Sequence, residues 1–199
     1  SKGVLNPSEG SFEIWFTPKI FDPAVNTRIV QTNIPDLSSR FIIYIQSNGS
    51  LRFAIAGTDS PSKIITSDPG IINPRNLYYI CMTWKDQIMY AYINGQLIGI
   101  AEVGSDAIIG EFFYICADYN GYQINNSIVH DIRISNIRRS ASEISSNYYN
   151  KNDLVIDEHT TYKLYYDSFN KTIKLPNDFM HPVKLITNHD LRKRLLFVN

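Results

Sequence analysis

Cysteine is scarce in this chain, with two residues among 199. So few cysteines exclude a disulfide framework as the main source of stability. Cys81 and Cys116 both lie in apolar, strand-like runs, YYICMTW and FFYICAD. A bridge between them requires that the two strands lie side by side, whereas unbridged cysteines behave as small apolar residues of a core. The sequence favours two buried thiols and leaves the bridge open.

Long apolar runs and net charge are also missing. No run approaches the roughly 20 apolar residues that span a bilayer, so we predict no membrane insertion. The formal net charge is 0, which argues against a general attraction to nucleic acid. The sequence begins Ser1-Lys2-Gly3, without an initiator Met or a signal peptide, so we expect a fragment of a longer protein.

Motifs of metal and nucleophilic chemistry are absent from the sequence as well. The four histidines, at positions 130, 159, 181 and 189, show no His-x-x-x-His spacing. There is no Gly-x-Ser-x-Gly elbow and no glycine-rich phosphate loop. His130 precedes Asp131 in a strand-like run, where we expect a structural role rather than that of a general base. These absences point away from an enzyme, although a Ser-His-Asp triad is defined by geometry and not by spacing.

The central feature is the run 77–101, LYYICMTWKDQIMYAYINGQLIGIA. Its residues are mostly aromatic, β-branched and sulfur-containing, which is typical of buried or half-buried strands. Lys85-Asp86-Gln87 interrupts the run, and Asn94-Gly95 does so again. Asn and Gly tolerate the positive φ that a two-residue type I′ turn requires, so Asn94-Gly95 predicts a tight hairpin. The sequence therefore predicts an antiparallel meander here.

Similar runs recur along the chain with turn residues between them. Hydrophobic residues make up 44% and charged residues 19%, as in folded soluble domains. Ser140 followed by Glu143 is a capping box that predicts one short helix of about two turns. About eleven strands with one helix predict a sandwich of two sheets rather than alternating strands and helices. Outside the central run, the predicted strands are 11–18, 27–32, 41–46, 51–56, 63–66, 111–117, 123–135 and 160–169.

The last thirty residues differ from the rest. Residues 171–199 carry six basic residues and two acidic ones, a net charge of +4 against −4 for the preceding part. Residues 190–196 also have the apolar spacing of a short helix. We predict a domain at 1–169 and a basic extension at 170–199. The extension either packs back on the sandwich or docks a neighbouring subunit or domain.

Three stretches together resemble the laminin G-like, or concanavalin A-like, jelly-roll family. They are GSFEIWFT at 10–17, YYICMTWKDQIMYAYINGQLIG at 78–99 and HDIRISNIRRSASEI at 130–144. The resemblance covers roughly residues 8–169 and implies a two-sheet antiparallel sandwich. It also implies that the strand at 162–167 pairs beside the first strand. The family resembled contains binding modules for glycans or cell-surface proteins, sometimes with calcium at the rim.

Enzymes on the fold resembled carry two glutamates in a Glu-x-Asp-x-x-Glu pattern. Retaining hydrolysis needs two carboxyl groups about 5–5.5 Å apart on one face. The pattern is missing here: Glu13 stands alone in its strand, and Glu102 and Glu111 flank a loop. We interpret them as solvated carboxylates at strand edges. The chain is therefore expected not to be an enzyme, and a glycoside hydrolase is the least favoured alternative.

A possible glycan site is suggested by the turn at 118–122. Sugar recognition needs a flat aromatic ring and planar hydrogen-bonding groups on a rigid rim. Asp118, Tyr119, Asn120 and Tyr122 supply both, and Asp59 in the loop 57–62 can add to them. The alternative is an Asx-type turn with packed tyrosines. No cofactor is predicted except possible calcium, for which loop acids at 36, 59, 106 and 118 are available without a recognisable ligand set, so the metal stays unknown.

These patterns favour a non-catalytic module of a larger protein that recognises a surface glycan or glycoprotein. The expected location is extracellular or on a virion surface, and cell adhesion is a related role. The alternative is a structural domain, of the phage tail or baseplate type, whose C-terminal arm docks neighbouring subunits or domains. No nucleic-acid partner is expected.

Overall fold

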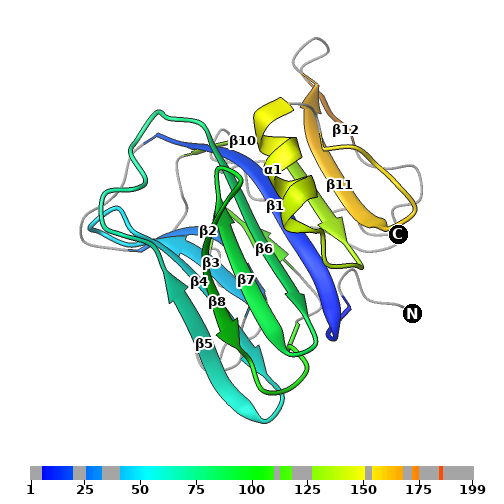
Figure 1. The fold of residues 1–199 in the computed structure, drawn as a ribbon. Helices are drawn as coiled ribbons and strands as arrows, with labels where there is room; N and C mark the ends of the chain where they lie inside the picture. Colours follow the sequence, from blue (N-terminus) through cyan, green and yellow to red (C-terminus); the bar gives the residue numbers. More distant parts are fainter. Residues whose placement is uncertain are drawn as a thin grey trace.

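The computed structural model describes residues 6–19, 26–32, 41–109, 113–117, 127–150, 154–167, 172–174 and 184–185. Within these residues the chain forms thirteen strands and one helix. The strands make two sheets that pack face to face, and the helix lies across the outer side of one of them (Figure 1). The predicted all-β jelly-roll sandwich with one short helix is confirmed.

Sheet A has seven strands in the order β12-β11-β10-β1-β6-β7-β8. All its pairings are antiparallel, and β1 lies between β10 and β6. The central meander thus forms one side of the sheet. The strand bounds are β1 Glu9–Pro18, β6 Tyr78–Lys85, β7 Ile88–Ile93, β8 Gln96–Glu102, β10 Ser127–Ser135, β11 Thr160–Asp167 and β12 Thr172–Lys174.

Sheet B has six strands in the order β13-β9-β2-β3-β4-β5. Its pairings are antiparallel except that β13 runs parallel to β9. The strand bounds are β2 Thr27–Thr32, β3 Ile42–Ile45, β4 Leu51–Gly57, β5 Ser60–Thr66, β9 Phe113–Ile115 and β13 Lys184–Leu185.

The core fills the space between the two sheets because apolar residues alternate along the strands. Phe12, Ile14 and Phe16 of β1 are fully buried there, opposite Ile43 and Phe53 of sheet B. Where the edges of the two sheets meet, Gly99 of β8 lies against Ile65 of β5, and a Cβ at Gly99 would lie 2.8 Å from Ile65 Cγ2. A side chain at this position would push the two edges apart.

Two tight turns build the meander. Asn94 and Gly95 have φ values of 52° and 76°, so the turn between β7 and β8 has the backbone that the sequence predicted. Asp86 and Gln87, between β6 and β7, also have positive φ, at 50° and 64°. Neither is a residue type that gives a strong hairpin signal, so the interruption at Lys85-Asp86-Gln87 predicted a tight turn here without its backbone geometry.

The helix α1 spans Ala141–Asn150, one turn longer than predicted. Its capping box is confirmed: the Ser140 N–H donates to Glu143 Oε2 at 2.8 Å, and the Glu143 N–H donates to Ser140 Oγ at 3.2 Å. Ile144 is the buried residue of the helix and packs on Trp15, Tyr79 and Tyr92 of sheet A. The helix thereby covers a second, smaller apolar cluster on the outer side of the sheet.

Two details of the predicted topology are wrong. The late strand β11 pairs with β10 and β12, not with the first strand, because β10 and β6 occupy both edges of β1. The predicted strand at 63–66 begins earlier, at Ser60. In the described residues, the predicted strands at 111–117 and 123–135 form pairs only at Phe113–Ile115 and Ser127–Ser135.

Beyond residue 170 the structure describes two short strands. β12 extends sheet A by pairing with β11, and β13 pairs with β9 in sheet B. The possible helix at 190–196 lies outside the described residues. The division at residue 169 and the role of the extension therefore stay predictions. The one described helix is too short and too polar to cross a membrane.

Candidate functional site

Glu13 is fully buried on the outer side of sheet A, beneath α1, and not solvated as the sequence suggested. Its carboxylate accepts two hydrogen bonds from Arg133, Nε to Oε2 at 2.7 Å and Nη2 to Oε1 at 2.8 Å. Tyr79 Oη and Asn147 Nδ2 also donate to Oε1, at 2.5 and 3.1 Å. Burial and the adjacent carboxylate raise the pKa of Tyr79 well above its usual value, so the phenol keeps the proton that it donates.

This arrangement decides what Glu13 can do chemically. Four donors occupy its two oxygens, and the helix covers it, so a substrate has no approach to the carboxylate. Glu102, the other described glutamate considered above, is exposed on the edge strand β8. Glu111 lies outside the described residues. Glu13 therefore has the geometry of a structural ion pair and not that of a glycosidase carboxylate.

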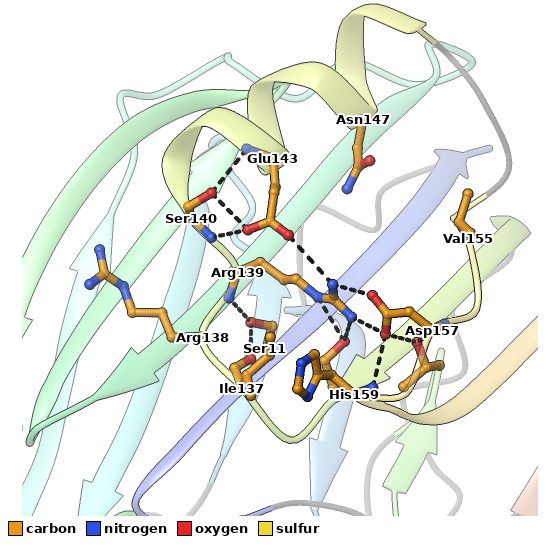
Figure 2. A network of polar contacts seen from close by, with 12 residues as sticks. Ser11, Ile137, Arg138, Arg139, Ser140, Glu143, Asn147, Val155, Asp157 and His159 are labelled. Carbon is orange, nitrogen blue, oxygen red and sulfur yellow. Dashed lines mark hydrogen bonds and ion pairs between the residues drawn. The ribbon is translucent and has the colours of Figure 1, made fainter.

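A second polar network surrounds Arg139, just before α1 (Figure 2). Its guanidinium donates to both oxygens of Asp157, at 2.5 and 2.7 Å, and to Ser135 Oγ at 3.0 Å. The hydrogen bonds from Arg139 hold the pKa of Asp157 well below its usual range. Figure 2 shows Arg139 between the first turn of α1, at Glu143, and the segment that carries Asp157. The network ties the helix and this segment to the end of β10.

His130 and Asp131 do not form a catalytic pair. Adjacent residues of a strand point to opposite faces, and here His130 is exposed while Asp131 is buried. His130 Nε2 shares a hydrogen bond of 2.9 Å with Thr17 Oγ1, and Asp131 Oδ2 accepts one from the Leu154 N–H at 2.8 Å. Both residues connect β10 to neighbouring segments.

The two cysteines are free and buried. Cys81 lies in the cluster under α1, whereas Cys116 lies in the core between the sheets. The alternative of a bridge between them is therefore wrong. Burial raises the pKa of the Cys116 thiol to about 12, so it stays protonated and unreactive.

Of the predicted glycan-site residues, the structure describes Asp59 alone. Asp59 is exposed in the turn between β4 and β5, where its N–H donates to Ser105 Oγ at 3.2 Å. Asp118, Tyr119, Asn120 and Tyr122 lie outside the described residues. Because β9 runs antiparallel to β4, the chain leaves β9 at the end of sheet B opposite to Asp59. A glycan site that combines Asp59 with the turn 118–122 therefore stays a prediction, and the strand directions do not favour it.

Calcium also stays a prediction. Among the residues that the structure describes, no three His, Cys, Asp or Glu side chains gather as metal ligands. Asp36 and Asp118 are outside them. Asp59 and Asp106 lie in adjoining loops, joined by a hydrogen bond from the Thr58 N–H to the Asp106 carbonyl at 3.0 Å. Two carboxylates supply at most four oxygens, whereas calcium takes six to eight.

The outer face of sheet B carries a polar and aromatic row that the sequence analysis missed. The paired residues Arg28, Tyr44, Arg52 and Thr66 lie side by side across β2, β3, β4 and β5. Arg28 Cζ lies 4.7 Å from the centroid of the Tyr44 ring, and Arg52 Cζ lies 6.0 Å from it. Arg52 Nη1 also donates to Tyr44 Oη at 2.9 Å. Two guanidinium groups thus hold one tyrosine ring in place.

Unsatisfied polar atoms lie beside this row. Gln31 is 0% exposed, and neither atom of its carboxamide has a hydrogen-bond partner. The Nε of Arg52 is also buried without a partner. Leaving a buried polar group unpaired costs about 1–3 kcal/mol, so such groups are rare and often mark functional positions. We name Arg28, Tyr44, Arg52 and Thr66 the sheet B row.

Charge distinguishes the two sheets. The described strands of sheet B contain basic residues and no acidic residue, whereas those of sheet A contain both kinds. Exposed acidic residues lie in the adjoining loops, at Asp59, Asp68 and Asp106, so the single sign of charge is a property of the strands and not of the whole face. The basic residues in the strands of sheet B are Arg28, Arg52, Lys63 and Lys184.

The described fold is thus a two-sheet jelly-roll sandwich with a single helix on one outer face and a polar row on the other. Residues 1–145, nearly three quarters of the chain, match the model of the concanavalin A-like lectin/glucanases superfamily. The chain belongs to this superfamily. The match supports the resemblance drawn from the sequence, whose three stretches fall within it.

Solved structures share the fold at low identity. The native heptameric SAP-like pentraxin from Limulus polyphemus is 16% identical, with a TM-score of 0.58 over 84% of this chain and 79% of that one. The botulinum neurotoxin type G receptor-binding domain is 15% identical, with a TM-score of 0.54 over 96% of this chain and 53% of that one. The binding domain of botulinum neurotoxin DC in complex with SialylT is 16% identical, with a TM-score of 0.56 over 73% of this chain and 36% of that one. No curated protein matches the chain.

Proposed function

We propose that the chain is a non-catalytic module that binds a surface glycan or glycoprotein through the outer face of sheet B. The observation that carries the proposal is the half-buried Tyr44 ring held between Arg28 and Arg52. The exposed part of this fixed ring offers apolar contact to a sugar, and the flanking groups donate hydrogen bonds to its hydroxyls. Because the ring lies on a strand and not on a loop, little ordering is needed on binding.

The absence of catalysis is part of this proposal. The superfamily includes glucanases as well as lectins, so membership alone does not decide between them. The state of Glu13 supports a binding role, because that carboxylate is already saturated with hydrogen bonds under α1. An extracellular or virion-surface location, including a role in cell adhesion, belongs to the same proposal.

A glycan array tests the proposal directly. The purified chain should bind at least one glycan, and Tyr44→Ala should abolish that binding because it removes the ring. Tyr149→Ala is the matched control, since Tyr149 is 66% exposed on α1, on the outer side of the other sheet. Loss of binding in both variants, or in neither, would contradict the assignment of the face.

The same array tests the loop predicted from the sequence. Tyr119→Ala and Tyr122→Ala remove the aromatic rings of the alternative site, and Asp59→Asn removes the carboxylate that was predicted to support it. If these variants lose glycan binding while Tyr44→Ala keeps it, the site lies at the loop and not on sheet B. An array without any bound glycan would overturn the proposed function itself.

A second role, docking to neighbouring parts of a larger assembly, is favoured by two exposed apolar residues. Leu97 and Ile100 of the edge strand β8 are 50% and 57% exposed. Adjacent exposed apolar side chains are typical of protein contact surfaces. If this surface joins copies of the chain, light scattering should show an oligomer that Leu97→Ser with Ile100→Ser dissociates. A monomer at all concentrations would contradict self-assembly.

A further inference from the structure

The sheet B row has the chemistry of a site for an acidic ligand. A neutral sugar needs a ring and hydrogen-bonding groups but gains little from two cations. Here two guanidinium groups lie over the Tyr44 ring, with Arg28 Cζ at 4.7 Å and Arg52 Cζ at 6.0 Å from its centroid. The described strands of sheet B carry no acidic residue that would pair with Arg52.

Arg52 is the residue most clearly available to a ligand. Its side chain is half-buried, its Nη1 bonds Tyr44 Oη, and it forms no ion pair within the described part of the chain. In contrast, Arg133 of β10 and Arg139, just before α1, each hold a carboxylate of this same chain. Proteins rarely bury part of an arginine without pairing its charge, so Arg52 is suited to a carboxylate or a sulfate from outside.

The row opens toward the edge of the sheet. Arg28 is only 8% exposed at the inner end, whereas Thr66 on β5 is exposed, and the neighbouring Ile64 is 45% exposed. A ligand that enters over β5 meets Arg52 first and Tyr44 next. Resting on the proposed glycan-binding function, we propose that the sheet B row recognises an acidic saccharide, with Arg52 pairing its carboxylate or sulfate and the exposed part of Tyr44 contacting its ring.

Matched sets of glycans provide the test. Each set has one neutral core and its sialylated and sulfated forms, such as lactose, 3′-sialyllactose and 3′-sulfolactose. The chain should bind acidic members and leave the neutral member unbound, and the preferred form tells whether a carboxylate or a sulfate is recognised. The affinity for the acidic form, measured by titration calorimetry, should weaken as NaCl rises from 50 to 500 mM because the pairing is ionic.

Substitutions at Arg52 test whether its guanidinium binds the acidic group of the saccharide. Arg52→Gln should weaken binding of the acidic form about tenfold to a hundredfold, as expected on losing a charged hydrogen bond. Arg52→Lys should give an intermediate affinity, because it keeps the charge and loses the planar fork. Lys63→Gln is the control: it removes a positive charge from exposed Lys63 on β5, outside the row, and should leave the affinity unchanged.

The possible results separate this inference from the function on which it rests. Equal binding of neutral and acidic members, or an unchanged affinity in Arg52→Gln, would overturn the acidic ligand and leave the glycan-binding role intact. An array with no bound glycan would overturn both. If Arg52→Gln fails to fold, as judged by circular dichroism, the preference for acidic members and the salt dependence of the unsubstituted chain still decide the question.

Discussion

Glu13 and Arg133 form a two-point ion pair between neighbouring strands, and neither side chain reaches solvent beyond 4%. Taking both charges out of water is costly, so the pair need not add net stability as a whole. Each partner nevertheless depends on the other, because a single buried charge has no water to replace the lost contact. Tyr79 and Asn147 depend on the same carboxylate.

Glu13→Ala should therefore destabilise the chain strongly. We expect a loss of about 3–5 kcal/mol in the free energy of unfolding, because the substitution leaves the Arg133 charge buried and unpaired. Urea denaturation followed by circular dichroism measures it. Glu9→Gln is the control, since the pair of Glu9 with Lys85 is partly exposed and should cost about 1 kcal/mol or less. Similar losses in the two variants would contradict the burial of Glu13.

Ser140→Ala tests the start of α1. The substitution removes the hydroxyl that accepts from the Glu143 N–H, and caps of this kind contribute about 1 kcal/mol. The loss should appear in urea denaturation and as faster amide hydrogen exchange in the first turn of the helix. Ser142→Ala is the comparison variant, because Ser142 Oγ shares a 3.0 Å hydrogen bond with Ser140 Oγ but accepts from no helix N–H among the described hydrogen bonds. If Ser142→Ala costs as much as Ser140→Ala, the capping role is wrong.

Asp157 should make stability depend on pH in the acid range. Its folded pKa is lowered by Arg139, so its ionised form stabilises the fold. The contribution is complete above the unfolded pKa of about 3.9 and is lost as the pH falls below that value toward the folded pKa. Asp157→Asn should remove this part of the acid dependence, measured as the midpoint of urea unfolding between pH 6 and pH 2. Asp68→Asn, at an exposed position without a described ion pair, should leave the acid dependence as it is.

Gly10→Ala should be destabilising because Trp84 fills the space beside Gly10. A Cβ at this position would lie 2.3 Å from Trp84 Cζ2, so the indole has to move. Overpacking of this kind costs about 1–3 kcal/mol. A double-mutant cycle with Trp84→Phe isolates the clash, since the smaller ring should recover part of the loss. If the two substitutions add without coupling, the proximity of Gly10 to Trp84 is not the cause.

Local patterns predicted the parts of the fold that depend on neighbouring residues in the sequence. The Asn94-Gly95 turn, the capping box of Ser140 and Glu143, and the alternation along β1 are properties of short segments. Those segments were sufficient to predict two antiparallel sheets. The partner of β11 was not predictable in this way, because the edge that a late strand joins is decided by which strands already occupy the sheet.

The contacts of the candidate site depend even more on the pairing of strands that lie far apart in the sequence. Nothing in the residues around Glu13 shows that Arg133, 120 positions away, neutralises it. The sheet B row has the same origin: Arg28, Tyr44 and Arg52 come together only through the registers of β2, β3 and β4. The outward alternation of Tyr44 and Arg52 in their strands was the one signal available, and it does not by itself identify neighbours. The loop residues 118–122 remain a prediction from local composition.

The position of α1 has a practical consequence for measurements on this molecule. The helix lies on the outer side of sheet A (Figure 1), and Tyr149 on this helix is 66% exposed. A label or a sensor-chip linkage introduced at residue 149 would attach the molecule through α1 and leave the outer face of sheet B open to solution. Immobilisation through β5 would instead block the route to Arg52, so the two attachment points should give different apparent affinities on the same chip.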